Sequence, residues 1–107
     1  MERLQCQFAN ANQLYLAYMG FLSEGGLFFA SLSPWQLGQS VSVSYRLPND
    51  PLEYRFEGVV VWVNPVADKE RAQGVGVRFG ADHSSHRHRI EQVLADQLSS
   101  SQLTSTL

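Results

Sequence analysis

Strict alternation of polar and apolar side chains over residues 40–47 is the feature that most constrains the fold. The apolar side chains stand at every second position, with serine or arginine between them: Val41, Val43, Tyr45 and Leu47. Because successive side chains of a strand point to opposite faces, this segment predicts a strand with one buried and one solvent-facing side. The run Pro48–Pro51 then favours a turn, since proline fixes φ and Asn and Asp bond to their own backbone. A hairpin with residues 52–63 follows.

Other segments also show strand patterns. Residues 4–8 alternate, residues 27–31 are rich in Phe and follow glycines, and residues 74–79 are bounded by turn-forming stretches. In residues 52–63, Gly58 breaks the alternation as a bulge would. The side chains expected to face inward there are Tyr54, Phe56, Val59, Val61 and Val63. Trp62 then faces the other way, either under a helix or on an outer surface. Five or six antiparallel strands are expected, in a small barrel.

Two helical segments are expected. Residues 14–22 are apolar almost all round and fit one or two helical turns broken at Gly20, after the turn-prone run of residues 10–13. A C-terminal helix starts from one of three cap residues, Asp82, Ser84 or Ser85. It carries an apolar face that should dock on the sheet, formed by Ile90, Val93, Leu94 and Leu98. Residues 1–98 are thus one domain, and the polar residues 99–107 are expected to be a flexible tail.

Composition excludes several classes of protein. A chain of 107 residues with 44% hydrophobic residues suits one domain, and its formal charge of −2 gives no broad field for nucleic acid or an anionic membrane surface. Its one cysteine, Cys6, cannot form an internal disulfide and alternates with apolar neighbours, so packing is its expected role. Neither a membrane-spanning run nor a signal peptide is evident. We therefore expect a soluble, cytoplasmic protein.

An ordered set of short motifs covers nearly the whole domain. GGLFF, WQLGQSVSV, GVVVWVNP and GVGVRF occur in that order and are followed by the C-terminal helix. In this order they resemble the PilZ family over roughly residues 3–98. The stretch LYLAYMGFLSEGGLFFAS is similar to the subgroup that acts in type IV pilus biogenesis rather than to the cyclic di-GMP receptors. The resemblance implies a mainly β fold, a six-stranded antiparallel β-barrel with a C-terminal α-helix packed on it.

In receptor members of that family, the resemblance implies two ligand motifs, an RxxxR pair and D/N-x-S-x-x-G at the first hairpin. Arginine suits phosphate and guanine, and Asp or Asn can bond to a base edge. In this chain the only arginine upstream of Ser23 is Arg3, so no pair exists. Ser23 and Gly26 match the second motif, but Phe21 stands at its acid or amide position. The ligand motif is degenerate, and we expect no cyclic di-GMP binding and no cofactor.

Neither a metal site nor catalysis finds support in the residue pattern. His83 and His86 share a helix face, but His88 points elsewhere, so three-point coordination is strained and solvated helix residues are expected. Ser23 and Glu24 with a histidine fit no motif that fixes their spacing, so no catalytic or metal residues are assigned and no enzyme is expected.

Two hypotheses are open for the role of the aromatic residues before and after the Ser23–Gly26 turn. They can plug the barrel and pack under the helix, or some of them can stay exposed as a contact patch. The surface expected to bind a partner comprises Tyr15, Tyr18, Met19, Phe21, Leu22, Phe28 and Trp35. The resemblance implies a type IV pilus adapter for twitching motility, which contacts the pilus-extension ATPase (PilB-like) and, as a second partner, a degenerate GGDEF/EAL-domain regulator (FimX-like). The alternative is a cyclic di-GMP receptor with an atypical site, involving Arg46, Arg55, Arg71 or Arg78.

Overall fold

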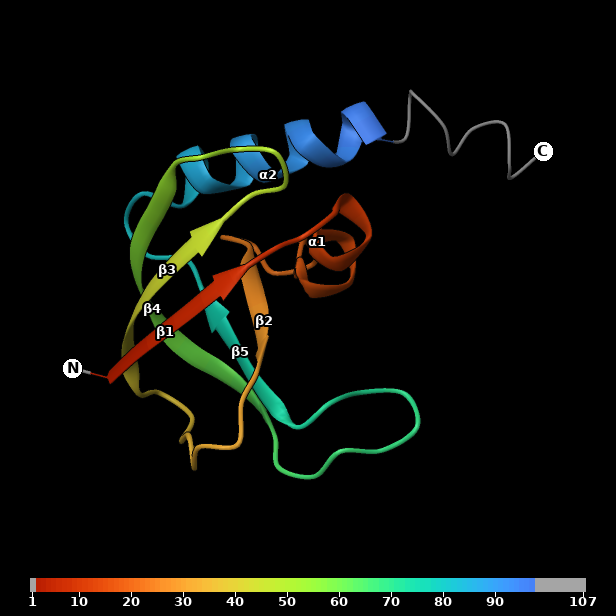
Figure 1. Cartoon of the computed structure of the whole chain (residues 1–107). Coiled ribbons are helices and arrows are strands. Elements are labelled where there is room, and N and C mark those ends of the chain that lie inside the picture. Colours follow the sequence, from red (N-terminus) through yellow and green to blue (C-terminus); the bar gives the residue numbers. More distant parts are fainter. Residues whose placement is uncertain (1, 98–107) are drawn as a thin grey trace.

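A computed structural model describes residues 2–97, so Leu98 and the expected tail at residues 99–107 lie outside the described residues. Two helices and five strands alternate irregularly along this part of the chain (Figure 1). In chain order they are β1 (Glu2–Gln7), α1 (Ala11–Ala17), β2 (Gly26–Ala30), β3 (Ser40–Arg46), β4 (Glu53–Asn64), β5 (Gly74–Arg78) and α2 (His83–Gln97).

The strands form one curled sheet in the order β1-β3-β4-β5-β2. β3, β4, β5 and β2 pair in antiparallel fashion, whereas β1 runs parallel to β3. Within residues 2–97 the structure has five strands in a curled sheet, of the five or six expected in a barrel, and the prediction that all of them pair antiparallel is wrong for β1 and β3. The reason is the connection: α1 and β2 separate β1 from β3 in the chain, which gives the length that a parallel crossover needs. The sheet's two edges are β1 and β2.

The predicted hairpin of β3 and β4 is confirmed, and its irregularity lies elsewhere than predicted. The two strands pair from Arg46 and Glu53, beside the turn, to Ser40 and Val59. The register shift lies between Val60 and Trp62, three residues beyond the bulge predicted at Gly58. Val60 rather than Val59 is therefore buried. Gly58 instead allows the backbone of β5 to lie close to β4, because a Cβ at this position would be 2.2 Å from the carbonyl oxygen of Arg78.

α1 lies earlier than the predicted helix. The Asn10 side chain accepts a hydrogen bond from the Gln13 backbone N–H (2.9 Å), so part of the segment read as a turn is the helix cap. The helix ends at Ala17, before Gly20, because Tyr18 leaves it to pair with Leu27 at the edge of β2. Residues 18–22 are therefore extended or turned, not helical.

The concave face of the sheet holds the core, and α2 crosses one end of it (Figure 1). α2 begins directly after Asp82, one of the three predicted cap residues, with Ser84 and Ser85 inside the helix. As predicted, Ile90 is fully buried and Val93 and Leu94 pack against the core. The turns at residues 31–39 and 65–73 lie at the opposite end (Figure 1).

Candidate functional site

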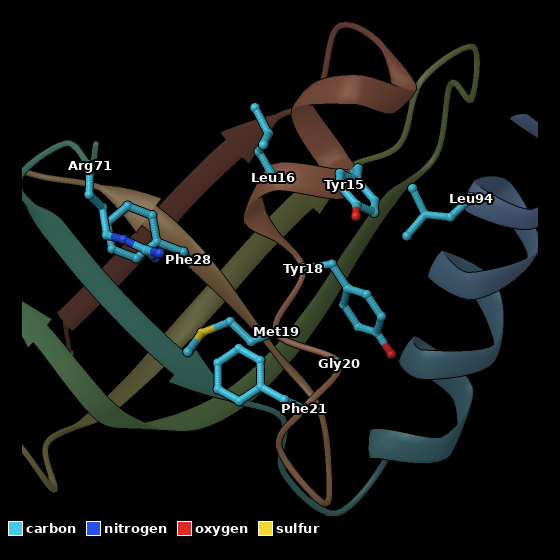
Figure 2. Close-up of a pocket in the computed structure, with 9 residues that line it drawn as sticks. All are labelled: Tyr15, Leu16, Tyr18, Met19, Gly20, Phe21, Phe28, Arg71 and Leu94. Carbon is cyan, nitrogen blue, oxygen red and sulfur yellow. The ribbon is translucent and has the colours of Figure 1, made fainter. Parts of the chain in front are cut away.

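A groove of about 530 Å³ lies between α1, the segment that follows it and α2. Figure 2 shows apolar side chains from all three along its walls. Phe21 and Tyr15 leave 80% and 64% of their surface exposed, so their rings are available for contact. We call this feature the aromatic groove; its lining residues are Tyr15, Leu16, Tyr18, Met19, Gly20, Phe21, Phe28, Arg71 and Leu94.

The floor of the aromatic groove rests on the convex face of β5. Met19 is 5% exposed and lies over Gly76, where a Cβ would come within 2.9 Å of its sulfur. Phe28 lies over Gly74 in the same way and packs on Trp62 with ring centroids 5.4 Å apart. Trp62 is thus on the convex face, an alternative that its position in the strand left open. Glycine at both β5 positions makes room for these apolar side chains.

The groove unites five of the seven residues expected at a partner surface. Trp35 is elsewhere: it is buried in the main core, and its Nε1 donates to the Ser31 hydroxyl (2.9 Å). Leu22 is half-buried against Gly26 and does not line the groove. Sequence reasoning missed Leu16, Arg71 and Leu94. Leu16 lies in the same apolar run, whereas the other two come from distant segments that only the fold brings here.

Arg87 of α2 holds the turn that carries Phe21. Its Nη1 donates to the carbonyl oxygens of Leu22 (2.9 Å) and Ser23 (3.2 Å). Gly25 has a φ of +79°, and a Cβ there would lie 2.9 Å from Arg87 Cγ, so glycine is required on both counts. The Ser23–Gly26 turn is therefore a glycine-dependent corner whose carbonyl groups are bonded within the chain.

A second contact ties the groove to α2. The Tyr18 hydroxyl donates to the Glu91 carboxylate (2.6 Å), and Arg87 lies 3.4 Å from the same carboxylate. Burial, together with this hydrogen bond and the negative charge of Glu91, raises the pKa of Tyr18 well above its usual range. Tyr18 therefore keeps its proton, and its hydrogen bond to Glu91, to a higher pH than an ordinary tyrosine would.

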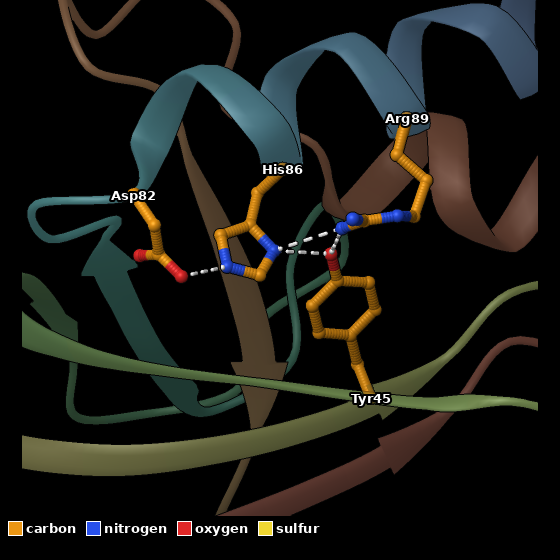
Figure 3. Close-up of polar contacts among 4 residues, drawn as sticks. All are labelled: Tyr45, Asp82, His86 and Arg89. Carbon is orange, nitrogen blue, oxygen red and sulfur yellow. Dashed lines mark hydrogen bonds and ion pairs between the residues drawn. The ribbon is translucent and has the colours of Figure 1, made fainter.

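A polar cluster centred on the buried His86 lies between α2 and the sheet (Figure 3); its members are Tyr45, Asp82, His86 and Arg89. His86 is 3% exposed; its Nδ1 lies 2.6 Å from the Tyr45 hydroxyl and its Nε2 lies 2.8 Å from the Asp82 carboxylate. Burial raises the pKa of Tyr45 to about 12, with Arg89 opposing the shift from 3.2 Å. The expectation of solvated histidines is wrong for His86, because the helix places it over the sheet's core rings, although His88 is exposed.

This cluster joins α2 to the sheet. His86 packs on the rings of Phe56 and Phe79 as well as bonding to Tyr45, so its contacts lie within the core. Within residues 2–97, no three His, Cys, Asp or Glu side chains are grouped as a metal site would require. The cluster therefore orients α2, and through Arg87 and Glu91 it orients the aromatic groove.

The family comparison agrees with this architecture. A model of the PilZ domain matches residues 2–96, nearly the whole chain. The chain belongs to the PilZ domain family. A comparison with curated proteins gave no match. PilZ domains are typically non-enzymatic binding domains, so this chain is expected to work by binding. In the described part of the PilZ domain, neither helix is long and apolar enough to cross a membrane.

The four arginines considered for an atypical PilZ ligand site do not form one cluster: Arg46 and Arg55 lie two register positions apart on the paired strands β3 and β4, whereas Arg78 lies on β5 and Arg71 in the loop before it. Arg55 is exposed beside Glu53, and Arg78 lies 3.9 Å from Glu24. Arg71 lines the aromatic groove, with its guanidinium 4.4 Å from the centre of the Trp62 ring. It is the member of this group whose guanidinium lies over two aromatic rings, those of the half-buried Phe28 and Trp62.

Proposed function

We propose that this PilZ domain is a non-catalytic adapter of type IV pilus biogenesis that contacts the pilus-extension ATPase through the aromatic groove. The observation that carries the proposal is the exposure of Phe21, 80% of whose surface is free, at a position where receptor members would have a hydrogen-bonding group. An exposed ring on a fixed turn suits protein contact rather than nucleotide recognition.

The neighbours of Phe21 extend the same apolar surface. Tyr15 and Leu16 are 64% and 71% exposed on α1, whose buried side is formed by Leu14 and Ala17. Aromatic side chains cost little conformational entropy when they are immobilised and are enriched among interface anchors. The half-buried Tyr18 and the buried Met19 support these exposed groups from below.

The turn at residues 21–26 is poorly suited to hold a phosphate or a base. Phe21 has no side-chain donor or acceptor, and the first-strand arginine pair of the receptors is missing. Arg87 already bonds to the carbonyl groups of Leu22 and Ser23. A ligand at this turn would have to displace those contacts, which supports an adapter over a receptor.

The test is retention of the purified ATPase by the immobilised protein. Wild type should retain it, and Phe21→Ala should weaken retention at least tenfold without loss of folding, because the ring is solvent-exposed. Tyr18→Ala should weaken it as well. The matched control is Leu32→Ala, an 85% exposed leucine at the opposite end of the sheet, which should bind like wild type. If both groove variants bind like wild type, the aromatic groove is not the contact; if wild type retains nothing, the ATPase is not the partner.

A degenerate GGDEF/EAL-domain regulator is the proposed second partner of the adapter. The same immobilised variants test this. Loss of the regulator with Phe21→Ala would place it on the aromatic groove in competition with the ATPase. Unchanged retention would place it on another surface.

A cyclic di-GMP receptor with an atypical site is the second candidate function. Arg71 favours it, because a guanidinium beside the half-buried rings of Phe28 and Trp62 can stack on guanine and pair with phosphate. Calorimetry with the dinucleotide distinguishes the two functions. Micromolar binding that Arg71→Ala abolishes would support the receptor, and the absence of heat would support the adapter.

A further inference from the structure

The two edge strands of the sheet face one another across a slot of about 260 Å³. β1 contributes one wall and β2 the other; among residues 2–97, β1 has no pairing partner on that side and β2 has one only near its start, where Leu27 bridges to Tyr18. The pairing of each neighbour also shows that β1 and β2 run in opposite directions. We call this feature the edge slot; it is lined by Leu4, Gln5, Cys6, Gln7, Phe8, Gln13, Phe28, Phe29 and Ala30.

The backbone of both strands directs hydrogen-bonding groups into the edge slot. The Phe8 N–H donates to the backbone carbonyl oxygen of Arg46, on the β3 side (3.0 Å). Because the backbone groups of successive residues in a strand point to opposite sides, those of Gln5 and Gln7 point away from β3 and into the slot. Next to β2, the N–H of Ser31 donates to the backbone carbonyl oxygen of Gln73, on the β5 side (3.0 Å). The backbone N–H and carbonyl groups of Ala30, one residue earlier, therefore point to the slot. Unpaired strand edges of this kind are templates for a further strand.

The open edge of β2 already accepts extended chain at one end. Tyr18 forms an antiparallel bridge with Leu27, and the Met19 N–H donates to the Gly26 carbonyl group (2.9 Å). This short pairing follows directly after the end of α1 at Ala17 and does not reach Ala30. The remaining edge has the same geometry and is free to continue the ladder with a segment from another chain.

The side chains that line the edge slot favour a binding segment without charged residues. None of the residues that line the slot is charged. β1 also lacks the lysine, proline or bulge by which natural edge strands avoid pairing, since its sequence ERLQCQ has its charges at residues 2 and 3, beyond the slot. Burying a charged side chain here would leave it unpaired, so an uncharged segment is favoured.

We propose that the edge slot binds an extended, uncharged segment of a partner protein, which adds as a strand antiparallel to β1 and lies against β2. Antiparallel pairing with β1 is preferred because β1 offers the longer free edge and antiparallel ladders are the more stable per residue. The lined part of β1, residues 4–7, accommodates about four residues, or roughly 13 Å of strand. The segment takes the place of a sixth strand between the two edges.

This proposal is independent of which protein occupies the aromatic groove. The two features meet at Phe28, which lines both, so one partner with a contact patch and an adjacent extended segment can engage them together. Loss of ATPase binding would leave the edge slot and its chemistry unchanged.

The test uses a displayed library of eight-residue segments without charged side chains, selected against the full chain. Selected peptides should shift the backbone amide NMR signals of Gln5, Gln7 and Ala30 and slow their hydrogen exchange. N-methylation of the central amides of a selected peptide should weaken binding at least tenfold, because it removes the ladder donors while keeping the side chains. Gln7→Lys should weaken binding to a similar extent, whereas the control Gln36→Lys, at an exposed glutamine away from the slot, should not.

Four outcomes would overturn the proposal. The first is that selection yields no binder, and the second is that the amide shifts fall on the aromatic groove instead. The third is that sedimentation shows the chain dimerising through the same amides, in which case the occupant is a second copy and not a partner segment. An N-methylated peptide that binds as well as its parent would likewise exclude strand addition.

Discussion

Arg87 of α2 donates a hydrogen bond to the carbonyl oxygen of Leu22, a residue 65 positions earlier, at 2.9 Å. This contact joins the last helix to the turn that presents Phe21. The aromatic groove is therefore a composite of α1, the turn and α2, and its shape depends on how α2 is seated on the sheet.

Removing this contact should loosen the turn. Arg87→Gln cannot reach both carbonyl groups, and because Arg87 is partly exposed we expect a loss of about 1 kcal/mol in the free energy of unfolding, measured in urea. Amide exchange at residues 22–25 should quicken, and retention of the groove's partner should fall. Arg55→Gln is the control, since Arg55 is exposed and pairs with Glu53 alone, and it should change stability by less than about 0.5 kcal/mol. Equal effects of the two changes would contradict this role of Arg87.

The buried histidine should matter far more than the exposed one. His86→Ala removes a partner of the Tyr45 hydroxyl and opens a cavity among core rings, so we expect a loss of about 2 to 4 kcal/mol in chemical denaturation. His88→Ala, two positions along the same helix and exposed, should cost less than about 0.5 kcal/mol. Similar losses for both variants would show that the cluster does not hold α2.

Stability should fall on the alkaline side. The pKa of Tyr45 is raised to about 12 by burial, and that of Tyr54 is raised by its hydrogen bond to Asp50. A raised pKa means that the folded state holds the proton more tightly, so this stabilisation is complete below the unfolded pKa of about 10 and is lost as pH rises through the folded values. The free energy of unfolding, measured from pH 8 to 12, should decline above about pH 10. Tyr45→Phe should start less stable and decline less steeply; an unchanged slope would exclude Tyr45 as a cause.

Stability should also fall at low pH through Asp50. Its carboxylate accepts from the Tyr54 hydroxyl (2.6 Å) and from the Leu52 backbone N–H (3.0 Å), which lowers the pKa of Asp50. A lowered pKa gives stability that is present above the unfolded value of about 4 and disappears as pH falls through the folded one. Asp50→Asn should therefore flatten the acid limb of the stability curve. NMR titration of the carboxyl carbon at an ordinary pKa would contradict the assignment.

Two glycines of β5 should respond differently to alanine. At Gly74 the new Cβ would lie 2.2 Å from the backbone oxygen of Phe29, which cannot move without breaking the β2 pairing, so a loss of about 2 kcal/mol or more is expected. At Gly76 the nearest atom is the sulfur of Met19 at 2.9 Å, the end of a flexible side chain, and about 1 kcal/mol is expected. Thermal unfolding of both variants gives the comparison. A larger loss at Gly76 would mean that Met19 is more rigidly held than its contacts suggest.

Short-range patterns predicted the strands well and their partners poorly. The hairpin of β3 and β4 was predictable because one turn fixes its register, and α2 because its apolar face repeats at helical spacing. The parallel pairing of β1 was not, since alternation says which residues face inward but not which strand lies beside them. The bulge was predicted at Gly58 but lies between Val60 and Trp62, because the pairing of β4 with β5, and not the glycine, decides where the register shifts.

The candidate site divides in the same way. The sequence by itself determined that aromatic residues crowd the segment around Phe21 and that Arg3 is the only arginine before Ser23, because both follow from the order of residues without the fold. Only the tertiary structure decided that Phe21 is exposed while Met19 and Trp35 are buried, and that Arg87 and His86 seat α2 beside the groove. Exposure and pairing depend on which distant surfaces meet, and no local pattern contains that information.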